Sequence, residues 1–68
     1  MKYRFYYNYN TGHFYKIINE TNIENAKIKF FNFINEKYCK PARIEIIKIE
    51  KIIDNRIYEI ERGGKNND

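Results

Sequence analysis

The stretch KYRFYYNYNTGHFYKII, residues 2–18, decides the fold, because its apolar residues recur at every second position. The residues of one parity in its first half are Tyr3, Phe5, Tyr7 and Tyr9. Such alternation is typical of half-buried strands. We therefore predict two antiparallel strands, at 2–9 and 13–18, joined by the turn Asn10-Thr11-Gly12. Asn suits the start of such a turn and Gly12 suits a left-handed residue at its end, which indicates a three-residue loop.

The loop length sets the register of this hairpin. A three-residue loop places Tyr7 opposite Tyr15 and Phe5 opposite Ile17 on one apolar face. The alternative, a two-residue turn, would put Lys16 on the core face, so we predict the first pairing. The opposite, open face is then expected to carry Lys2, Arg4, Tyr6, Phe14 and Lys16.

A helix is predicted after the second strand, because the apolar period changes from two to 3.6 residues. Thr21-Asn22-Ile23-Glu24 has the spacing of a capping box, with Thr21 as the N-cap. The predicted core stripe consists of Ile23, Ala26, Phe30, Phe33, Ile34 and Lys37/Tyr38. Pro41 should end the helix around Tyr38 or Cys39, since a proline and the residue before it both disfavour helix.

A second hairpin is predicted at residues 43–53 and 56–62, with Asp54-Asn55 as a type I′ turn. The predicted core face comprises Ile47, Ile49, Ile53, Tyr58 and Ile60, and the open face pairs Lys48 with Glu61 and Ile52 with Ile57. Ile44 and Ile46 have the wrong parity for the core. Two interpretations remain open for them: a bulge near Ile46-Ile47 corrects the parity, or both side chains are exposed.

These elements predict an α+β fold of ββαββ order. A right-handed crossover gives an antiparallel sheet of strand order 2-1-3-4 with the helix packed on one face. Residues 1–62 should form a single domain, and residues 63–68, which contain no packing residues, a flexible C-terminal tail.

The composition limits what can stabilise this domain. The 68 residues include thirteen Ile but no Leu, Val or Trp, and a core this small rarely contributes more than about 3–5 kcal/mol of net stability. Cys39 is the only cysteine and His13 the only histidine, which excludes a disulfide and leaves too few ligands for a structural zinc. We therefore expect close packing, a tendency to form a homodimer, and no cofactor.

The residues for enzymatic chemistry are almost absent. The chain has no serine, and a Cys39-His13 pair would have to form between a helix end and a hairpin turn. The strand glutamates each have a Lys or Arg nearby, as on a solvated sheet face. We therefore predict that the protein is not an enzyme. No signal peptide or membrane span is apparent, which favours a cytoplasmic protein with no membrane partner.

Two binding hypotheses follow from the open face. Its candidate partner-binding residues are Lys2, Arg4, Tyr6, Phe14, Lys16, Ile44, Ile46 and Lys48. Exposed Ile and aromatic side chains favour a protein partner. The alternative is a small nucleic-acid-binding regulator, because aromatic and basic side chains on a sheet can stack bases and contact phosphates. The net charge of +4 permits this alternative without requiring it.

The whole-chain profile resembles the small α+β proteins that phages and mobile elements of AT-rich bacteria encode against host defences, anti-CRISPR proteins among them. The resemblance consists of size, an Ile/Asn/Lys/Tyr-rich composition, the one-helix sheet layout and the lack of catalytic residues. It assigns no role to individual residues. It implies stoichiometric inhibition, in which the protein binds a CRISPR effector or another nuclease complex in the host cytoplasm and blocks its nucleic-acid channel or its assembly.

Overall fold

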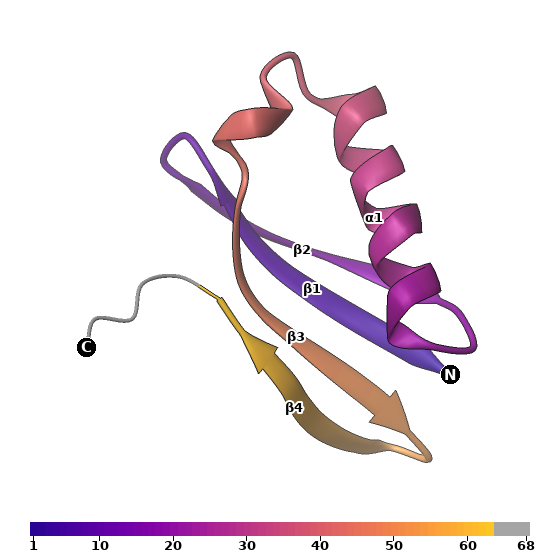
Figure 1. The fold of residues 1–68 in the computed structure, drawn as a ribbon. Coiled ribbons are helices and arrows are strands. Elements are labelled where there is room, and N and C mark those ends of the chain that lie inside the picture. The colour runs from indigo at the N-terminus through magenta and orange to yellow at the C-terminus, as the bar shows by residue number, and fades with distance from the viewer. Residues whose placement is uncertain (64–68) are drawn as a thin grey trace.

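The computed structural model, which describes residues 1–63, contains one antiparallel four-stranded sheet and one α-helix (Figure 1). The elements are β1 (Lys2–Tyr9), β2 (Gly12–Asn19), α1 (Ile23–Lys37), a short 3-10 helix (Pro41–Arg43), β3 (Glu45–Ile53) and β4 (Arg56–Arg62). The strand order is β2-β1-β3-β4, and α1 lies on one side of the sheet. The predicted α+β fold, its ββαββ order and its strand order are therefore confirmed.

The first hairpin has a tighter turn than the predicted three-residue loop. Tyr9 pairs with Gly12, so the turn consists of Asn10 and Thr11. Asn10 itself takes the positive φ, 56°, which the prediction assigned to Gly12. The chain therefore reverses one residue earlier than predicted, and every side chain of β2 changes face.

This register corrects the predicted position of two candidate residues. Phe14 pairs with Tyr7 and Lys16 with Phe5, so both side chains lie on the helix-covered face and not on the open face. Lys16 is tolerated there because β2 is an edge strand: its Nζ lies 4.5 Å from the centroid of the Phe33 ring, at the margin of the core. The cation thus remains half-exposed. A lysine on the core face, the reason for which we rejected this register, is therefore not buried.

Gly12 packs against the Phe14 ring, and its backbone is not in the left-handed region. A Cβ at this position would lie 2.6 Å from two carbons of the Phe14 ring. The absence of a side chain at Gly12 therefore lets the ring of Phe14 pack against the backbone of the turn.

Helix α1 begins one residue later than the predicted capping box. Asn22 is the N-cap, and its Oδ1 accepts a hydrogen bond of 2.8 Å from the backbone N–H of Asn25. The backbone N–H of Thr21, the predicted cap, instead donates to the carboxylate of Glu20. The helix ends at Lys37 with Tyr38 as its C-cap, as the position of Pro41 predicted.

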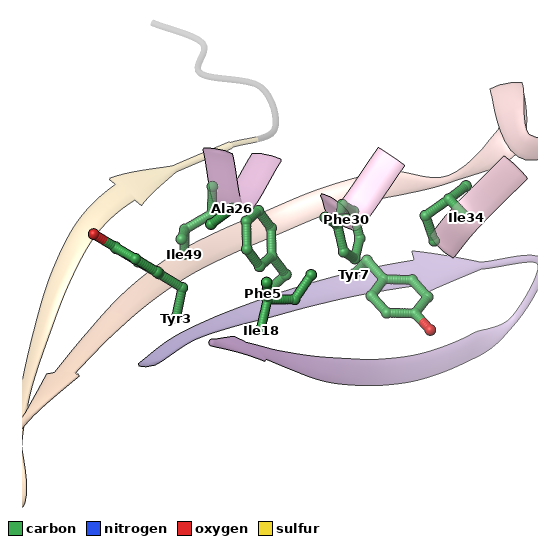
Figure 2. Close-up of a cluster of buried hydrophobic side chains, with 8 residues drawn as sticks. All are labelled: Tyr3, Phe5, Tyr7, Ile18, Ala26, Phe30, Ile34 and Ile49. Carbon is green, nitrogen blue, oxygen red and sulfur yellow. The ribbon is translucent and has the colours of Figure 1, made fainter. Parts of the chain in front are cut away.

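The core lies between α1 and the β1 side of the sheet (Figure 2). Its buried side chains are Tyr3, Phe5, Tyr7, Ile18, Ala26, Phe30, Ile34 and Ile49. At its centre the rings of Phe5 and Phe30 stack with centroids 4.4 Å apart and planes inclined by 8°. These two side chains join the middle of β1 to the middle of the helix, so they fix how α1 sits on the sheet.

A bulge in β3 decides between the two interpretations of Ile44 and Ile46. Tyr6 pairs with Lys48 but Tyr7 pairs with Ile46, so Ile47 is an extra residue in β3. The bulge turns Ile46 toward the helix side, where it and Ile44 pack against the core. Neither residue lies on the open face, and the interpretation that placed them there is wrong.

The second hairpin follows the prediction near its turn and departs from it further on. Asp54 and Asn55 have φ values of 50° and 64°, as a type I′ turn requires. Ile60 is an extra residue in β4, because Glu50 pairs with Glu59 whereas Ile49 pairs with Glu61. Lys48 consequently faces Arg62 rather than Glu61.

The predicted core of the second hairpin is wrong for β4, because α1 does not cover this strand (Figure 1). Every residue of β4 is exposed, including Tyr58 and Ile60.

Beyond β4, Gly63 donates its N–H to the carbonyl of Ile47 over 2.8 Å. The rest of the predicted tail, residues 64–68, lies outside the described residues. No helix in the described part of the chain is long and apolar enough to cross a membrane.

Candidate functional site

The strand register brings side chains from all four strands together on the face opposite α1, which we call the open face. Its residues are Lys2, Arg4, Tyr6, Tyr15, Ile17, Lys48, Glu50, Ile52, Ile57, Glu59 and Arg62. Antiparallel pairing places partner residues side by side on one face. The pairs Tyr15–Tyr6 and Tyr6–Lys48 form one row across the sheet, and Ile17–Arg4 and Arg4–Glu50 form the next.

Arg4 is at the centre of the open face. Its Cζ lies 5.6 Å from the ring centroid of Tyr6 and 5.7 Å from that of Tyr15. The two rings are tilted against one another with centroids 6.0 Å apart. Because a guanidinium is attracted to aromatic faces, these contacts restrict the rotamers of all three side chains.

Glu50 forms ion pairs with two cations on this face. Its Oε1 lies 3.7 Å from Nε of Arg4, and its Oε2 lies 3.3 Å from Nζ of Lys48. Glu50 as a whole residue is 9% exposed, although it is on the face that the helix leaves uncovered. Arg4 Nε and Glu50 Oε1 are buried and make no hydrogen bond to any described residue, so their contact is an ion pair only.

Lys48 and Arg62 are also close to partners on the open face. The ammonium of Lys48 also lies 4.9 Å from the ring centroid of Tyr6. Arg62 donates two hydrogen bonds to Glu59, of 2.7 and 2.9 Å. Arg4, Lys48 and Arg62 are thus each close to a carboxylate, which lowers the net potential of the face.

Apolar side chains flank these charges on both edge strands. Tyr15 is 60% exposed, Ile17 44% and Ile57 56%. The open face therefore combines an arginine that contacts two neighbouring tyrosines with a discontinuous apolar margin.

The structure distributes the predicted partner-binding residues over three places. Lys2, Arg4, Tyr6 and Lys48 lie on the open face, as predicted. Phe14 and Lys16 line a hollow between β2 and α1, and Ile44 and Ile46 pack against the core. The sequence analysis placed Tyr15 and Ile17 on the core face, whereas the structure places them on the open face. The rejected pairing, with a two-residue turn, predicts this position.

Residues suited to metal binding or nucleophilic catalysis are dispersed. Within residues 1–63, no three His, Cys, Asp or Glu side chains lie close enough together to hold a metal ion. Cys39 is exposed beyond the helix end, and His13 contacts the side chain of Asn8.

Comparisons of the chain with protein-family models, with curated proteins and with solved structures found no match. The resemblance to anti-CRISPR proteins therefore stays a prediction. The function has to be argued from the geometry of the open face.

Proposed function

We propose that this protein is a non-enzymatic binding module whose open face docks on a partner protein. The contact of Arg4 with the rings of both Tyr6 and Tyr15 is the observation that carries the proposal. Arg and Tyr are enriched among the residues that dominate protein–protein affinity. Because the contacts with the two rings already restrict Arg4, less side-chain entropy is lost when a partner binds.

The ion pairs of Arg4, Lys48 and Arg62 favour a protein over a nucleic acid as the partner of the open face. Nucleic-acid affinity depends on cations that neutralise phosphates. Arg4 and Lys48 already share the carboxylate of Glu50, and Arg62 is hydrogen-bonded to Glu59. A phosphate approaching these cations would meet the two carboxylates as well, so this surface suits a partner that presents both signs of charge.

The size of the sheet is sufficient for a stable interface. The molecule has principal extents of 34 × 32 × 19 Å, and the sheet forms one of its broad sides. A standard protein–protein interface buries about 800 Å² on each partner, which a face of these dimensions can supply.

The resemblance to phage-encoded inhibitors specifies the partner that we propose. On this proposal the protein occupies a surface of a host-defence nuclease complex, a CRISPR effector in particular, and blocks its action stoichiometrically. The small size and the preorganised open face are what such a blocking function needs.

The test is inhibition of a panel of purified CRISPR effector nucleases in a DNA cleavage assay. Titration of the protein into the sensitive effector should abolish cleavage at a saturating ratio of one protein molecule, or one dimer, per complex. The variant Arg4→Ala/Tyr6→Ala/Tyr15→Ala should leave cleavage intact. The control variant Ile28→Ala/Phe31→Ala/Arg43→Ala removes one arginine and two exposed apolar side chains outside the open face and should inhibit like the wild type.

Two outcomes would contradict this proposal. If no effector in the panel is inhibited, the inhibitor class is wrong. If the triple open-face variant inhibits as well as the wild type, the open face is not the binding surface. Sedimentation velocity of the two variants and the wild type tests the predicted homodimer, because a dimer formed through the open face should dissociate only in the first variant.

A further inference from the structure

A second candidate surface lies on the other side of β2, where the edge strand meets the C-terminal half of α1. A hollow of about 510 Å³ opens there, which we call the seam hollow. It is lined by Tyr7, His13, Phe14, Tyr15, Lys16, Phe33, Lys37 and Tyr38. None of these residues is acidic, so the seam hollow differs from the open face, which carries Glu50 and Glu59.

Two lysines at the seam hollow have no carboxylate partner among the described residues. Nζ of Lys16 lies 4.5 Å, and that of Lys37 6.0 Å, from the centroid of the same ring, Phe33. Within residues 1–63, neither lysine forms an ion pair. In contrast, Lys29 on the neighbouring stretch of the seam contacts Glu20 over 2.9 Å. Two uncompensated ammonium groups above one aromatic ring attract an anion.

Phe14 provides an accessible aromatic surface beside these cations. The ring is 44% exposed. It is held by Tyr7, whose ring centroid lies 5.6 Å away with the planes inclined by 29°, and by the backbone at Gly12. A ring fixed in this way and open on its remaining surface can stack with a nucleobase.

The seam hollow also contains a hydrogen-bond donor. The hydroxyl groups of Tyr7 and Tyr38 lie 2.8 Å apart, so one donates to the other and the second proton is available to a ligand. Burial, together with this hydrogen bond, raises the pKa of Tyr7 well above its usual value.

The shape of this surface favours an extended ligand. A second hollow of about 390 Å³ adjoins the first and shares Lys16 and Phe33 with it. The two hollows together follow the seam between β2 and α1. A ligand that continues past Lys16 would meet Asn32 and Glu36 there, so the positive potential is strongest at the Phe14 end.

We infer that the seam hollow binds single-stranded nucleic acid, with Lys16 and Lys37 contacting phosphates and Phe14 stacking on an unpaired base. This assigns the phosphate-binding and base-stacking chemistry to a different surface from the open face. The inference does not depend on the proposed protein partner, because the two surfaces have different residues at their centres.

The test is fluorescence anisotropy with a labelled oligothymidylate and a labelled oligouridylate of about 12 nucleotides, a length within the range of known single-strand sites. The variant Lys16→Gln/Lys37→Gln should bind more weakly. The slope of log affinity against log salt should be shallower by about 1.4, because each phosphate contact on a single strand contributes about 0.7. The control Lys51→Gln/Arg56→Gln removes the same charge at the opposite end of the sheet and should leave most of the affinity intact.

Stacking is tested separately at Phe14. Phe14→Leu keeps an apolar side chain of similar bulk and should weaken binding about 5- to 150-fold, whereas Phe14→Tyr should retain the wild-type affinity. Circular dichroism checks that both variants are folded. If Phe14→Leu binds like the wild type, or if the control pair loses as much affinity as the Lys16/Lys37 pair, the inference is wrong. Equal affinity for thymidine monophosphate and for the oligonucleotide would also overturn it, since the site would then hold only a small anion.

Discussion

Strands β1 and β4 have similar sequence patterns but different environments. Both mix apolar residues with charged ones, and β1 buries alternate side chains almost completely: Tyr3 is 1% exposed and Phe5 is fully buried. In β4, by contrast, Ile57 is 56%, Tyr58 46% and Ile60 41% exposed. The difference shows that an alternating pattern identifies a strand but not the amount of core that it will contribute.

β1 is buried and β4 exposed because the helix covers only part of the sheet. α1 has 15 residues and packs over β1 and β2, whose buried side chains it contacts directly. Toward β4 the helix forms an ion pair between Lys27 and Glu61, which is 2.9 Å long and half-exposed. Such pairs contribute little, so the stability of this small domain is concentrated in its β1 half.

The largest expected effect is that of Phe30→Ala, which removes the ring stacked on Phe5. Truncation of a buried phenylalanine costs about 3–5 kcal/mol, comparable with the whole stability of a domain of this size. We expect the variant to be unfolded or nearly so in urea denaturation followed by circular dichroism. Ile60→Ala in β4 should cost less than about 1 kcal/mol, because the side chain is already largely exposed. Equal losses for the two variants would contradict the contrast between β1 and β4.

A smaller loss in the free energy of unfolding is expected for substitutions in the ion pair between β1 and β3 on the open face. Arg4→Met leaves the nearly buried carboxylate of Glu50 with Lys48 alone and should cost about 1–3 kcal/mol. Arg62→Met breaks an exposed pair in the β4 half and should cost about 0–1 kcal/mol. The double variant Arg4→Met/Glu50→Leu should recover part of the first loss, since it removes the charge left without its partner. No recovery in a urea titration would mean that Glu50 is not destabilised by losing Arg4.

A third prediction compares two neighbouring residues at the start of α1. Asn22→Ala removes the acceptor for the N–H of Asn25 and should lower the free energy of unfolding by about 1 kcal/mol. Thr21→Ala should change it by less than half as much, because Asn22 and not Thr21 caps the helix. A thermal melt of both variants distinguishes the two caps, and a larger loss for Thr21→Ala would refute this assignment.

The last prediction concerns stability at alkaline pH, which should fall because the buried Tyr7 hydroxyl ionises. Burial raises the pKa of Tyr7 above its ordinary value of 10.0, so its contribution to stability is fully present below pH 10 and is lost as the pH rises further. The urea midpoint of the wild type should therefore fall more steeply above pH 10 than that of Tyr7→Phe, which has no ionisable group there. Parallel pH profiles would show that Tyr7 is not the group responsible.

Several parts of the fold could be predicted because neighbouring residues decide them. The alternation of residues 2–9, the change of period after Asn22 and the position of Pro41 each act over a few residues, and the elements that they predict are present. The Asp54-Asn55 turn is another local feature, since its conformation depends on two residues that tolerate positive φ.

The candidate site was harder to predict because a shift of one residue reverses a face. Asn10 and Gly12 can each supply the left-handed residue of the first turn, and the sequence does not rank them. The choice of Asn10 moved Phe14 and Lys16 to the seam hollow and brought Tyr15 and Ile17 to the open face.

The sequence by itself determined the elements, their order and the antiparallel sheet, because strand and helix periods are properties of short stretches of chain. Only the tertiary structure decided the register of β2, the bulges at Ile47 and Ile60, and which half of the sheet is covered. These depend on how the helix packs against β1 and β2, since its length allows it to cover that side and leaves β4 exposed.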